Sequence, residues 1–298
     1  MTIIEAALEK TKALRAARPD ARPAMEPRTS EPAEPNRRIS EAPAPKALIP
    51  PGSQIRAHRV EFDSHRAREK RVLLSAASAE DRAAVSAYGM LRTRILHRVR
   101  SNGWTTVGIT SAAPQDGKSL TAVNLALSLA RERNSCVVLL DLDMRNPTVC
   151  PTLGITPPTE LREFFDDRVA SPEDLFMSIG VDNLLIAGNT VATEHSADLL
   201  ASTRLEQLLT YIKQSTSQPL ILIDLPPVVS PADTLIVAPR LDAFVVVASQ
   251  GVTPRADLEK AAELLSEFQI AGFVLNRQVG GSKAYDYGYG YGSGSEKR

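Results

Sequence analysis

Cysteine is scarce in this chain, where only Cys136 and Cys150 occur among 298 residues. Two cysteines cannot build the disulfide framework of a small secreted domain, and their scarcity suits a reducing compartment. Long apolar runs are also lacking, since no stretch approaches the ~20 residues that span a bilayer. No signal-peptide pattern opens the chain, because charge follows Ile3 and Ile4 at once. We therefore expect a soluble, cytoplasmic protein.

Net charge is lacking as well, with 35 basic and 35 acidic residues. The balance conceals a division. Residues 1–103 hold 20 Lys/Arg and 12 Asp/Glu, or +8, whereas residues 104–298 hold 15 and 23, or −8. A basic half can face an acidic partner or a membrane surface, and a solvated, partly disordered arm would show the same charge. We expect no nucleic-acid partner.

Composition divides the chain into three parts. Nine of the 21 prolines fall within residues 19–52, a composition that buries no core. Residues 2–18 have the spacing of an amphipathic helix, which would be either a docking helix for a membrane partner or a frayed terminus. We therefore expect a disordered arm and linker over residues 1–80, a folded domain over 81–276 and a flexible tail over 277–298.

The spacing of apolar residues predicts the elements of the domain. A leading helix is expected over residues 81–100, with arginines crowded into its second half, where positive charge suits a helix C-terminus. Buried-strand patterns then alternate with helical patterns, which predicts an α/β fold with a doubly wound, mostly parallel sheet. The expected strands are 105–110, 137–141, 184–187, 220–224, 244–249 and 273–276, and the main expected helices run from the loop near residue 118 to about 133, over 203–213 and over 254–268.

The first of these strands leads into a phosphate-loop pattern over residues 112–119: a small residue, four of any kind, then Gly-Lys-Ser. A helix follows at once, so the loop amides and the helix N-terminus would face an anion. Lys118 can reach the β- and γ-phosphates of a nucleotide, and the Ser119 hydroxyl can ligate Mg²⁺. The bare pattern also occurs by chance in Ser/Gly loops. The residues expected to contact the nucleotide here are Ala113, Pro114, Gln115, Asp116, Gly117, Lys118, Ser119 and Leu120.

Two further buried strands end in carboxylates, one in Asp141 and Asp143 and the other in Asp224. Because a doubly wound sheet places ligand chemistry at the carboxyl ends of its strands, we expect these acids to share a site with the phosphate loop. Buried acids are costly unless they are paired or bound to metal, which supports a shared site. For Asp143, a structural salt bridge with Arg145 is the alternative.

Together these segments resemble the bacterial tyrosine kinases (BY-kinases) that regulate capsule and exopolysaccharide export. Residues 110–119 look like the Walker A motif of this family, Asp141 to Pro147 like its Walker A′, and residues 221–227 like its Walker B. The resemblance runs from about Val85 to the C-terminus. The opening residues 1–10 are similar to those of stand-alone autokinases found with exosortase systems.

The resemblance implies an ATP- and Mg²⁺-dependent tyrosine kinase with a P-loop NTPase-like fold. Asp141 would orient or deprotonate the acceptor hydroxyl, and Asn276 looks like the residue that contacts adenine in related ATPases, although an ordinary strand-end residue fits there too. The implied catalytic residues are Lys118, Asp141, Asp143 and Asp224, and the implied metal ligands are Ser119, Asp141, Asp143 and Asp224.

The C-terminal tail holds four of the six tyrosines in a Gly- and Asp-rich stretch. By itself this composition describes a flexible low-complexity tail. Beside a kinase-like domain the tyrosines are expected phosphoacceptors, offered to a neighbouring chain in trans. They are Tyr285, Tyr287, Tyr289 and Tyr291. The resemblance also implies a membrane-embedded polysaccharide co-polymerase or activator, which would recruit the chain to the inner membrane face, and a cognate tyrosine phosphatase.

The chain departs from the family pattern in two places. The family has Gly-Glu-Gly where this chain has Gln115-Asp116-Gly117, so a left-handed backbone at Gln115 would be strained. The subunit-contact pattern Glu-x-x-Arg-x-x-Arg falls on Ser86, Gly89 and Arg92, where one residue survives, so we expect poor assembly into a ring without a partner, although a homo-oligomer is possible.

Two other functions compete with the kinase. A partition-type ATPase would use ATP binding as a dimerisation switch, but such proteins carry a Lys early in the phosphate loop, where this chain has Ala112 and Ala113. A non-catalytic adaptor would keep the fold and lose the chemistry, which Gln115 and the altered subunit pattern favour slightly. The formation of phosphotyrosine separates the kinase from both.

Overall fold

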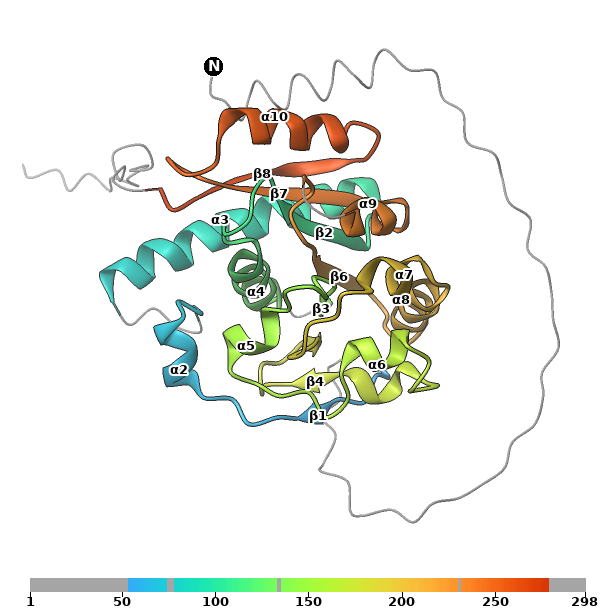
Figure 1. The fold of residues 1–298 in the computed structure, drawn as a ribbon. Coiled ribbons are helices and arrows are strands. Elements are labelled where there is room, and N and C mark those ends of the chain that lie inside the picture. Colours follow the sequence, from blue (N-terminus) through green and yellow to red (C-terminus); the bar gives the residue numbers. More distant parts are fainter. Residues whose placement is uncertain (1–52, 74–77, 133–134, 230–231, 279–298) are drawn as a thin grey trace, which may run out of the picture.

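A single mixed sheet forms the centre of the computed structural model, which describes residues 53–73, 78–132, 135–229 and 232–278 (Figure 1). Its strand order is β1-β4-β5-β3-β6-β2-β7-β8, and all neighbours run parallel except β4 and β5. The predicted doubly wound, mostly parallel sheet is therefore confirmed. The strands are β1 (His58–Arg59), β2 (Thr106–Ser111), β3 (Cys136–Asp141), β4 (Met177–Ser178), β5 (Leu184–Ala187), β6 (Pro219–Asp224), β7 (Ala243–Ser249) and β8 (Ile270–Asn276).

Helices cover both faces of the sheet, each over its own apolar core. The first four described helices contribute to one core, and the remaining five contribute to the other. The first face carries α2 (Ser64–Glu69), α3 (Ala79–Asn102), α4 (Lys118–Leu129) and α5 (Val149–Leu153). The second carries α6 (Leu161–Phe165), α7 (Ser196–Ala201), α8 (Arg204–Gln214), α9 (Asp233–Val237) and α10 (Arg255–Leu264), with 3-10 turns at Pro172–Leu175 and Ala238–Arg240.

Each central strand contributes to both cores, because successive side chains of a strand point to opposite faces. In β3, Val137 and Leu139 join the core beneath α2 to α5, whereas Val138 and Leu140 join the core beneath α6 to α10. Every residue of β2, β3 and β7 is buried. A parallel sheet that is covered on both sides therefore explains the near-continuous apolar runs of these strands.

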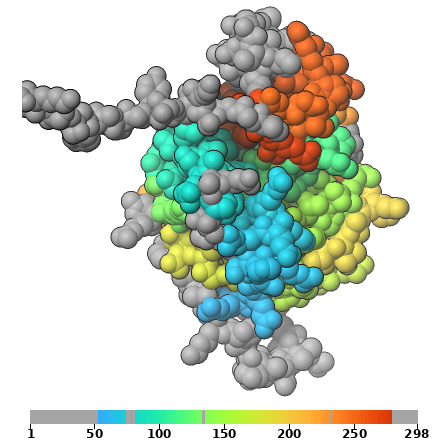
Figure 2. Space-filling model, turned by 90° about the vertical axis from the view of Figure 1, so that its left-hand side faces the viewer, coloured from blue at the N-terminus to red at the C-terminus, as the bar shows by residue number. Residues whose placement is uncertain are grey.

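Residues 53–73 belong to this packed unit, which differs from the expected arm reaching residue 80. β1 pairs with β4, and Ile55 and Ala57 enter the core beneath α6 to α10. Ala67 and Val72 enter the opposite core. The segment thus passes from one core to the other around the edge of the sheet, and Figure 2 shows it in blue along one side of the molecule. A few apolar residues in an Arg-rich stretch are enough to hold it there.

The end of this segment is fastened to α4, the helix that begins at the phosphate loop. The Leu73 N–H donates to Asn124 Oδ1 at 2.8 Å, and Asn124 Nδ2 donates to the Arg71 carbonyl at 3.1 Å. Asn124 is buried, so its amide is satisfied by the segment that crosses over it. The N-terminal segment and the nucleotide-side helix are therefore in direct contact.

The leading helix α3 is slightly longer than the predicted 81–100. Ser78 and Asp81 form a capping box at its start, and Gly103, with φ 67°, ends it in the left-handed conformation. Arg92, the surviving residue of the subunit-contact pattern, donates through Nη1 to the Ser128 carbonyl at 3.2 Å. It therefore joins α3 to α4 within the chain.

Several predicted boundaries shift. α4 ends at Leu129 instead of near residue 133, and α10 is shorter than the predicted 254–268. The expected N-terminal helix over residues 2–18, the linker over 19–52 and the four tail tyrosines lie outside the described residues. Across the described residues, no helix combines the length and apolarity needed to cross a membrane.

Candidate nucleotide-binding site

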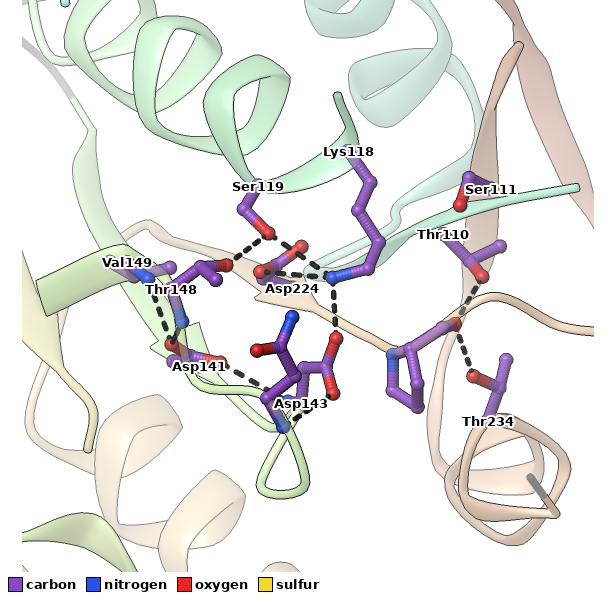
Figure 3. Close-up of polar contacts among 12 residues, drawn as sticks. Thr110, Ser111, Lys118, Ser119, Asp141, Asp143, Thr148, Val149, Asp224 and Thr234 are labelled. Carbon is purple, nitrogen blue, oxygen red and sulfur yellow. Dashed lines mark hydrogen bonds and ion pairs between the residues drawn. The ribbon is translucent and has the colours of Figure 1, made fainter. Parts of the chain in front are cut away.

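The candidate site lies at the carboxyl edge of the sheet, where β2, β6 and β3 end side by side. Asp141 and Asp224 are register partners at the ends of β3 and β6. Leu139 and Leu222, two positions earlier, belong to the core beneath α2 to α5. Because side chains alternate along a strand, both carboxylates lie on that same face, which α4 covers. The topology therefore directs two acids toward the start of α4 (Figure 3).

α4 begins directly at the phosphate loop. Its N-cap is Gly117, whose φ of 87° is a left-handed conformation that glycine adopts readily. A Cβ at this position would lie 2.2 Å from Asn276 Nδ2, so a larger residue would also have to displace the end of the Asn276 side chain. No side chain caps the helix. The amides of the first turn are therefore left to face an anion, and the helix dipole adds to the attraction.

Asp116 turns inward and holds the loop in shape. Its carboxylate accepts hydrogen bonds from the Ala113 N–H at 2.9 Å and from the Thr253 hydroxyl at 2.6 Å. Its carbonyl accepts from the Ser249 hydroxyl at 3.1 Å and from Asn276 Nδ2 at 2.9 Å. The Asp116 side chain thus serves the loop itself, and Asn276 lies against the loop from the end of β8.

The tip of the loop is exposed at Pro114 and Gln115, while Ala113 and Leu120 are partly buried. Gln115 has φ 63°, which confirms that this position takes a left-handed backbone. For a residue with a Cβ, that conformation costs about 1–2 kcal/mol. The Gln115 carbonyl accepts from Arg277 Nη2 at 2.8 Å, which helps to hold the strained tip.

The Lys118 side chain lies between two carboxylates (Figure 3). Its Nζ is 2.6 Å from Asp143 Oδ2 and 3.7 Å from Asp224 Oδ2, and it donates to Ser119 Oγ at 3.1 Å. Burial alone would lower the pKa of Lys118, but the charges of Asp224 and Asp143 outweigh it and raise the pKa above its ordinary value. The ammonium group therefore stays charged in the site.

The loop after β3 is built around Asp141. One carboxylate oxygen, Oδ2, accepts from the Thr148 and Val149 N–H groups at 3.0 and 2.9 Å. The other, Oδ1, accepts from the Asp143 N–H at 3.2 Å. Burial and the neighbouring Asp224 charge raise the pKa of Asp141 well above its usual range. Asp141 is thus both the acceptor that shapes this loop and a stronger base than an ordinary carboxylate.

The alternative salt bridge between Asp143 and Arg145 is not the one that forms. Asp143 faces the lysine of the phosphate loop, and its Oδ1 accepts from the Asn146 N–H at 3.2 Å. Arg145 Nε instead lies 3.3 Å from Asp233 Oδ2, which also accepts from the Ser196 hydroxyl at 2.5 Å. Arg145 therefore fastens the loop to α9, whose Asp233 also binds Ser196 of α7, and Asp143 remains in the site.

Asp224 is fully buried, and within the described residues neither of its oxygens has a partner in hydrogen-bonding geometry, although Ser119 and Lys118 face it. Burial raises the pKa of Asp224 to about 6 despite the nearby ammonium charge. An unsatisfied carboxylate beside a serine hydroxyl fits the oxygen ligands of Mg²⁺. No three Asp, Glu, His or Cys side chains among the described residues converge as a metal cluster. A cation here would therefore complete its shell with phosphate oxygens and water.

Thr148 is a site residue that the sequence analysis does not single out. Its hydroxyl donates to Ser119 Oγ at 2.6 Å, in addition to the bond from its N–H to Asp141. The only signal in the sequence is a hydroxyl residue directly after Asn146-Pro147. The structure thus places Thr148 between the phosphate-loop serine and the first carboxylate.

Two further threonines hold the loop after β6. Thr110 and Thr234 both donate their hydroxyls to the Pro226 carbonyl, at 2.6 and 2.8 Å. Both side chains are buried. They join the end of β2 and the start of α9 to the segment that follows Asp224. No pattern in the sequence predicts this role.

Comparisons with known proteins agree with this geometry. The family model described as ParA, NUBPL iron-transfer P-loop NTPase, matches residues 105–283, which is more than half of the chain. Tyrosine-protein kinase YwqD of Bacillus subtilis (strain 168) is 29% identical over 209 residues, which cover 67% of this chain and 84% of that protein. Tyrosine-protein kinase CpsD of Streptococcus agalactiae is 28% identical over 192 residues, or 64% of this chain and 82% of that protein.

The fold is shared with the kinase domain of the Escherichia coli tyrosine kinase ETK, at a TM-score of 0.59 and 22% sequence identity. That match covers 69% of this chain and 80% of the ETK domain. The phosphate loop, the two carboxylate-ended strands and these relatives lead to one assignment. The chain belongs to the ParA family of P-loop NTPases and, within it, to the bacterial tyrosine kinases.

Proposed function

We propose that this chain is an ATP- and Mg²⁺-dependent autokinase that phosphorylates tyrosines in its own C-terminal tail. The observation that carries the proposal is the cluster of Lys118, Ser119 and Asp224 at the start of an uncapped helix. It combines a cation, a hydroxyl and an unsatisfied carboxylate at one anion-attracting point, which are the groups that phosphoryl transfer requires.

Lys118 is the phosphate clamp. Its ammonium now lies 2.6 Å from Asp143 and would move from that carboxylate to the β- and γ-phosphates of ATP. Backbone amides of the loop from Gln115 to Leu120 would contact the same phosphates, because Pro114 has no N–H and the Ala113 N–H is already bound to Asp116. Asn276, beside the loop, is the proposed contact for adenine.

Ser119 and Asp224 are the proposed cation ligands, with Asp141 and Asp143 in the outer shell. Mg²⁺, when bound with ATP, neutralises charge that develops on the phosphates. Asp141 orients the acceptor hydroxyl and receives its proton. The raised pKa of Asp141 suits this role, because a base works best when its pKa approaches the working pH.

The proposed acceptors are Tyr285, Tyr287, Tyr289 and Tyr291, presented in trans to a neighbouring chain. Twenty-two residues from Arg277 onward can extend to roughly 70 Å at ~3.3 Å per residue, which is ample for such a reach. Each phosphate adds about −1.5 to −2 charge, so full modification adds roughly −6 to −8 to a chain whose net charge is zero. The modified tail would then be repelled by the acidic site and would release the neighbour.

The biological setting is proposed from the resemblance in sequence. The kinase would regulate the synthesis or export of an exopolysaccharide or capsule from the cytoplasm. A membrane-embedded co-polymerase or activator would recruit the chain to the inner membrane face, and a tyrosine phosphatase would reset the tail. Because Arg92 is engaged with Ser128 inside the chain, we expect ring assembly to depend on that partner.

The ParA family match favours a second candidate, an ATPase that uses ATP binding as a dimerisation switch. Two features favour the kinase over it. The Lys that partition ATPases carry early in the loop is replaced by Ala112 and Ala113, and the tyrosine tail would have no task.

A mixing experiment tests the proposal. An acceptor chain carries Lys118→Met, which removes the clamp and leaves its tail intact. A donor chain keeps the site and carries Phe at 285, 287, 289 and 291. After incubation of the mixture with Mg²⁺-ATP, mass spectrometry should find phosphotyrosine in the acceptor tail, and neither chain alone should acquire it there. Phosphotyrosine confined to Tyr88 or Tyr211, or none at all from the wild-type chain, would contradict the proposal.

A further inference from the structure

Thr148 stands at the N-cap of α5, where a threonine hydroxyl ordinarily caps the helix. Here the side chain makes no capping bond. The first amides of α5 are satisfied by Asp141 instead, because Oδ2 accepts from both the Thr148 and Val149 N–H groups. Asp141 thereby frees the Thr148 hydroxyl for another partner.

That partner is Ser119, which lies 29 positions away in the sequence, with a distance of 2.6 Å between the two hydroxyl oxygens. A hydroxyl oxygen has one proton and two lone pairs. One lone pair of Ser119 faces Thr148, and the other faces Lys118 Nζ at 3.1 Å. Both lone pairs of Ser119 are therefore engaged in the free chain, and its hydroxyl faces Asp224 without a hydrogen bond to it.

A cation that is to bind Ser119 Oγ needs one of those two lone pairs. Lys118 is the donor that leaves, because its ammonium moves to the phosphates in the proposed reaction. The Thr148 contact is then the one that continues to hold the serine. Ser119 is buried, with 8% of its surface exposed, so few other groups can orient its hydroxyl.

We propose that Thr148 is a positioning residue whose hydroxyl fixes the rotamer of Ser119 and keeps Oγ directed at the space beside Asp224. The proposal rests on the proposed function, because it concerns the Mg²⁺ that accompanies ATP. Asp141, Thr148 and Ser119 then form a continuous hydrogen-bonded chain from the loop after β3 to the first turn of α4 (Figure 3). Through this chain, the loop that carries two acids also sets the geometry of the cation ligand.

The neighbouring threonines show what a merely structural role looks like. Thr110 and Thr234 both donate to one backbone carbonyl, that of Pro226, so this carbonyl keeps a donor when either hydroxyl is removed. Thr148 donates to the side chain of a proposed metal ligand. Thr234→Val is therefore a matched control, since it removes a buried hydroxyl at the same edge of the sheet without changing the contacts of Ser119.

The test measures ATP affinity of the full-length chain by titration calorimetry, once in EDTA and once in Mg²⁺. The ratio of the two affinities is the gain due to magnesium. Thr148→Val keeps the shape and the backbone N–H but removes the hydroxyl, and it should reduce this gain by about tenfold, as expected for a partner that orients a metal ligand. Thr148→Ser should restore the gain, and Thr234→Val should leave it unchanged. The affinity in EDTA should be the same in all four proteins.

Three results would overturn the inference while leaving the proposed function intact. Thr148→Val could keep the full magnesium gain, Thr148→Ser could lose as much as Thr148→Val, or Thr148→Val could weaken binding equally in EDTA. A wild-type chain that binds no ATP would overturn both proposals together. Circular dichroism checks the fold of each variant, and Thr148→Ala replaces Thr148→Val if the latter does not fold.

Discussion

Asp141 and Asp224 end neighbouring strands in the same register, and both are fully buried, yet their surroundings are opposite. Asp141 accepts three backbone N–H bonds from the loop that follows it. Asp224 accepts none in hydrogen-bonding geometry from the described residues. The loop after β6 is held instead by Thr110 and Thr234, which bind the Pro226 carbonyl.

The difference teaches how one sheet edge can carry two tasks. Where the acid organises its own loop, the loop can be long and still well defined, as it is from Asp141 to α5. Where threonines organise the loop, the acid is left with unused lone pairs in a buried place. Such a group costs stability in the free protein, and a cation can recover that cost on binding. The contrast assigns loop architecture to Asp141 and cation binding to Asp224.

The largest expected effect compares Asp141→Ala with Asp224→Ala. Both changes remove the same atoms from buried sites, so the difference in unfolding free energy reports the lost hydrogen bonds. Three amides lose their acceptor in Asp141→Ala, at ~1–3 kcal/mol each, and we expect it to be less stable than Asp224→Ala by about 4 kcal/mol. Urea unfolding without nucleotide or metal measures both. Equal losses would mean that the two acids do not differ as the contacts indicate.

The second prediction sharpens the contrast between the two acids through the pH dependence of stability. The pKa of Asp224 is about 6 in the folded chain against an ordinary 3.8, so the folded state keeps its proton to higher pH than the unfolded state. The stability from this group is therefore complete below about pH 4 and is lost as the pH rises through 6, by roughly 3 kcal/mol.

Asp224→Asn cannot lose that proton, so its unfolding free energy should rise relative to wild type between about pH 4 and 7. The difference between the two proteins cancels the titrations of the distant acids. It reports Asp224 together with the fall in the Asp141 pKa that follows when the Asp224 charge is removed. Chemical denaturation at half-unit pH steps measures it. A difference that stays flat over this interval would show that Asp224 is not the strained acid of the pair.

Much of this site could be predicted from the sequence, because its main parts are local. A strand, a Gly-Lys-Ser loop and a helix are contiguous, and Asp141 and Asp224 each end an apolar run. The expected edge of the sheet follows from topology alone. The strain at Gln115 could be predicted for the same reason, because the need for a positive φ concerns the backbone of that one residue.

The rest depends on contacts between distant positions. Thr148 meets Ser119 across 29 residues, and Asp116 turns toward Thr253 across 137. No spacing rule foresees these, because the fold creates the proximity. The packing of residues 53–73 against the domain could not be predicted for another reason. Its apolar residues are few and serve opposite cores, so they follow neither a helical nor a strand period.

The smallest expected effect concerns the third loop at this edge, the phosphate loop, which resembles the Asp141 loop in being held by its own acid. Asp116 supplies that hold through Ala113 and Thr253, and the strain lies at Gln115, with φ 63°. Gln115→Gly should relieve the strain and stabilise the free chain by about 0.5–1 kcal/mol, less than the full cost of the conformation because glycine loses more entropy on folding. Gln115→Ala is the matched control.

The alanine variant removes the same side chain but keeps a Cβ, so it should show no gain. The carbonyl that binds Arg277 is present in all three proteins, which leaves that contact unchanged. Thermal unfolding without nucleotide measures the set, and ATP affinity should improve slightly in Gln115→Gly alone, since less strain then opposes the loop around the phosphates. A gain in Gln115→Ala equal to that in Gln115→Gly would place the cost in the side chain. The Gln115 backbone would then carry no strain, and the phosphate loop could not be divided into a part held by Asp116 and a part strained at Gln115.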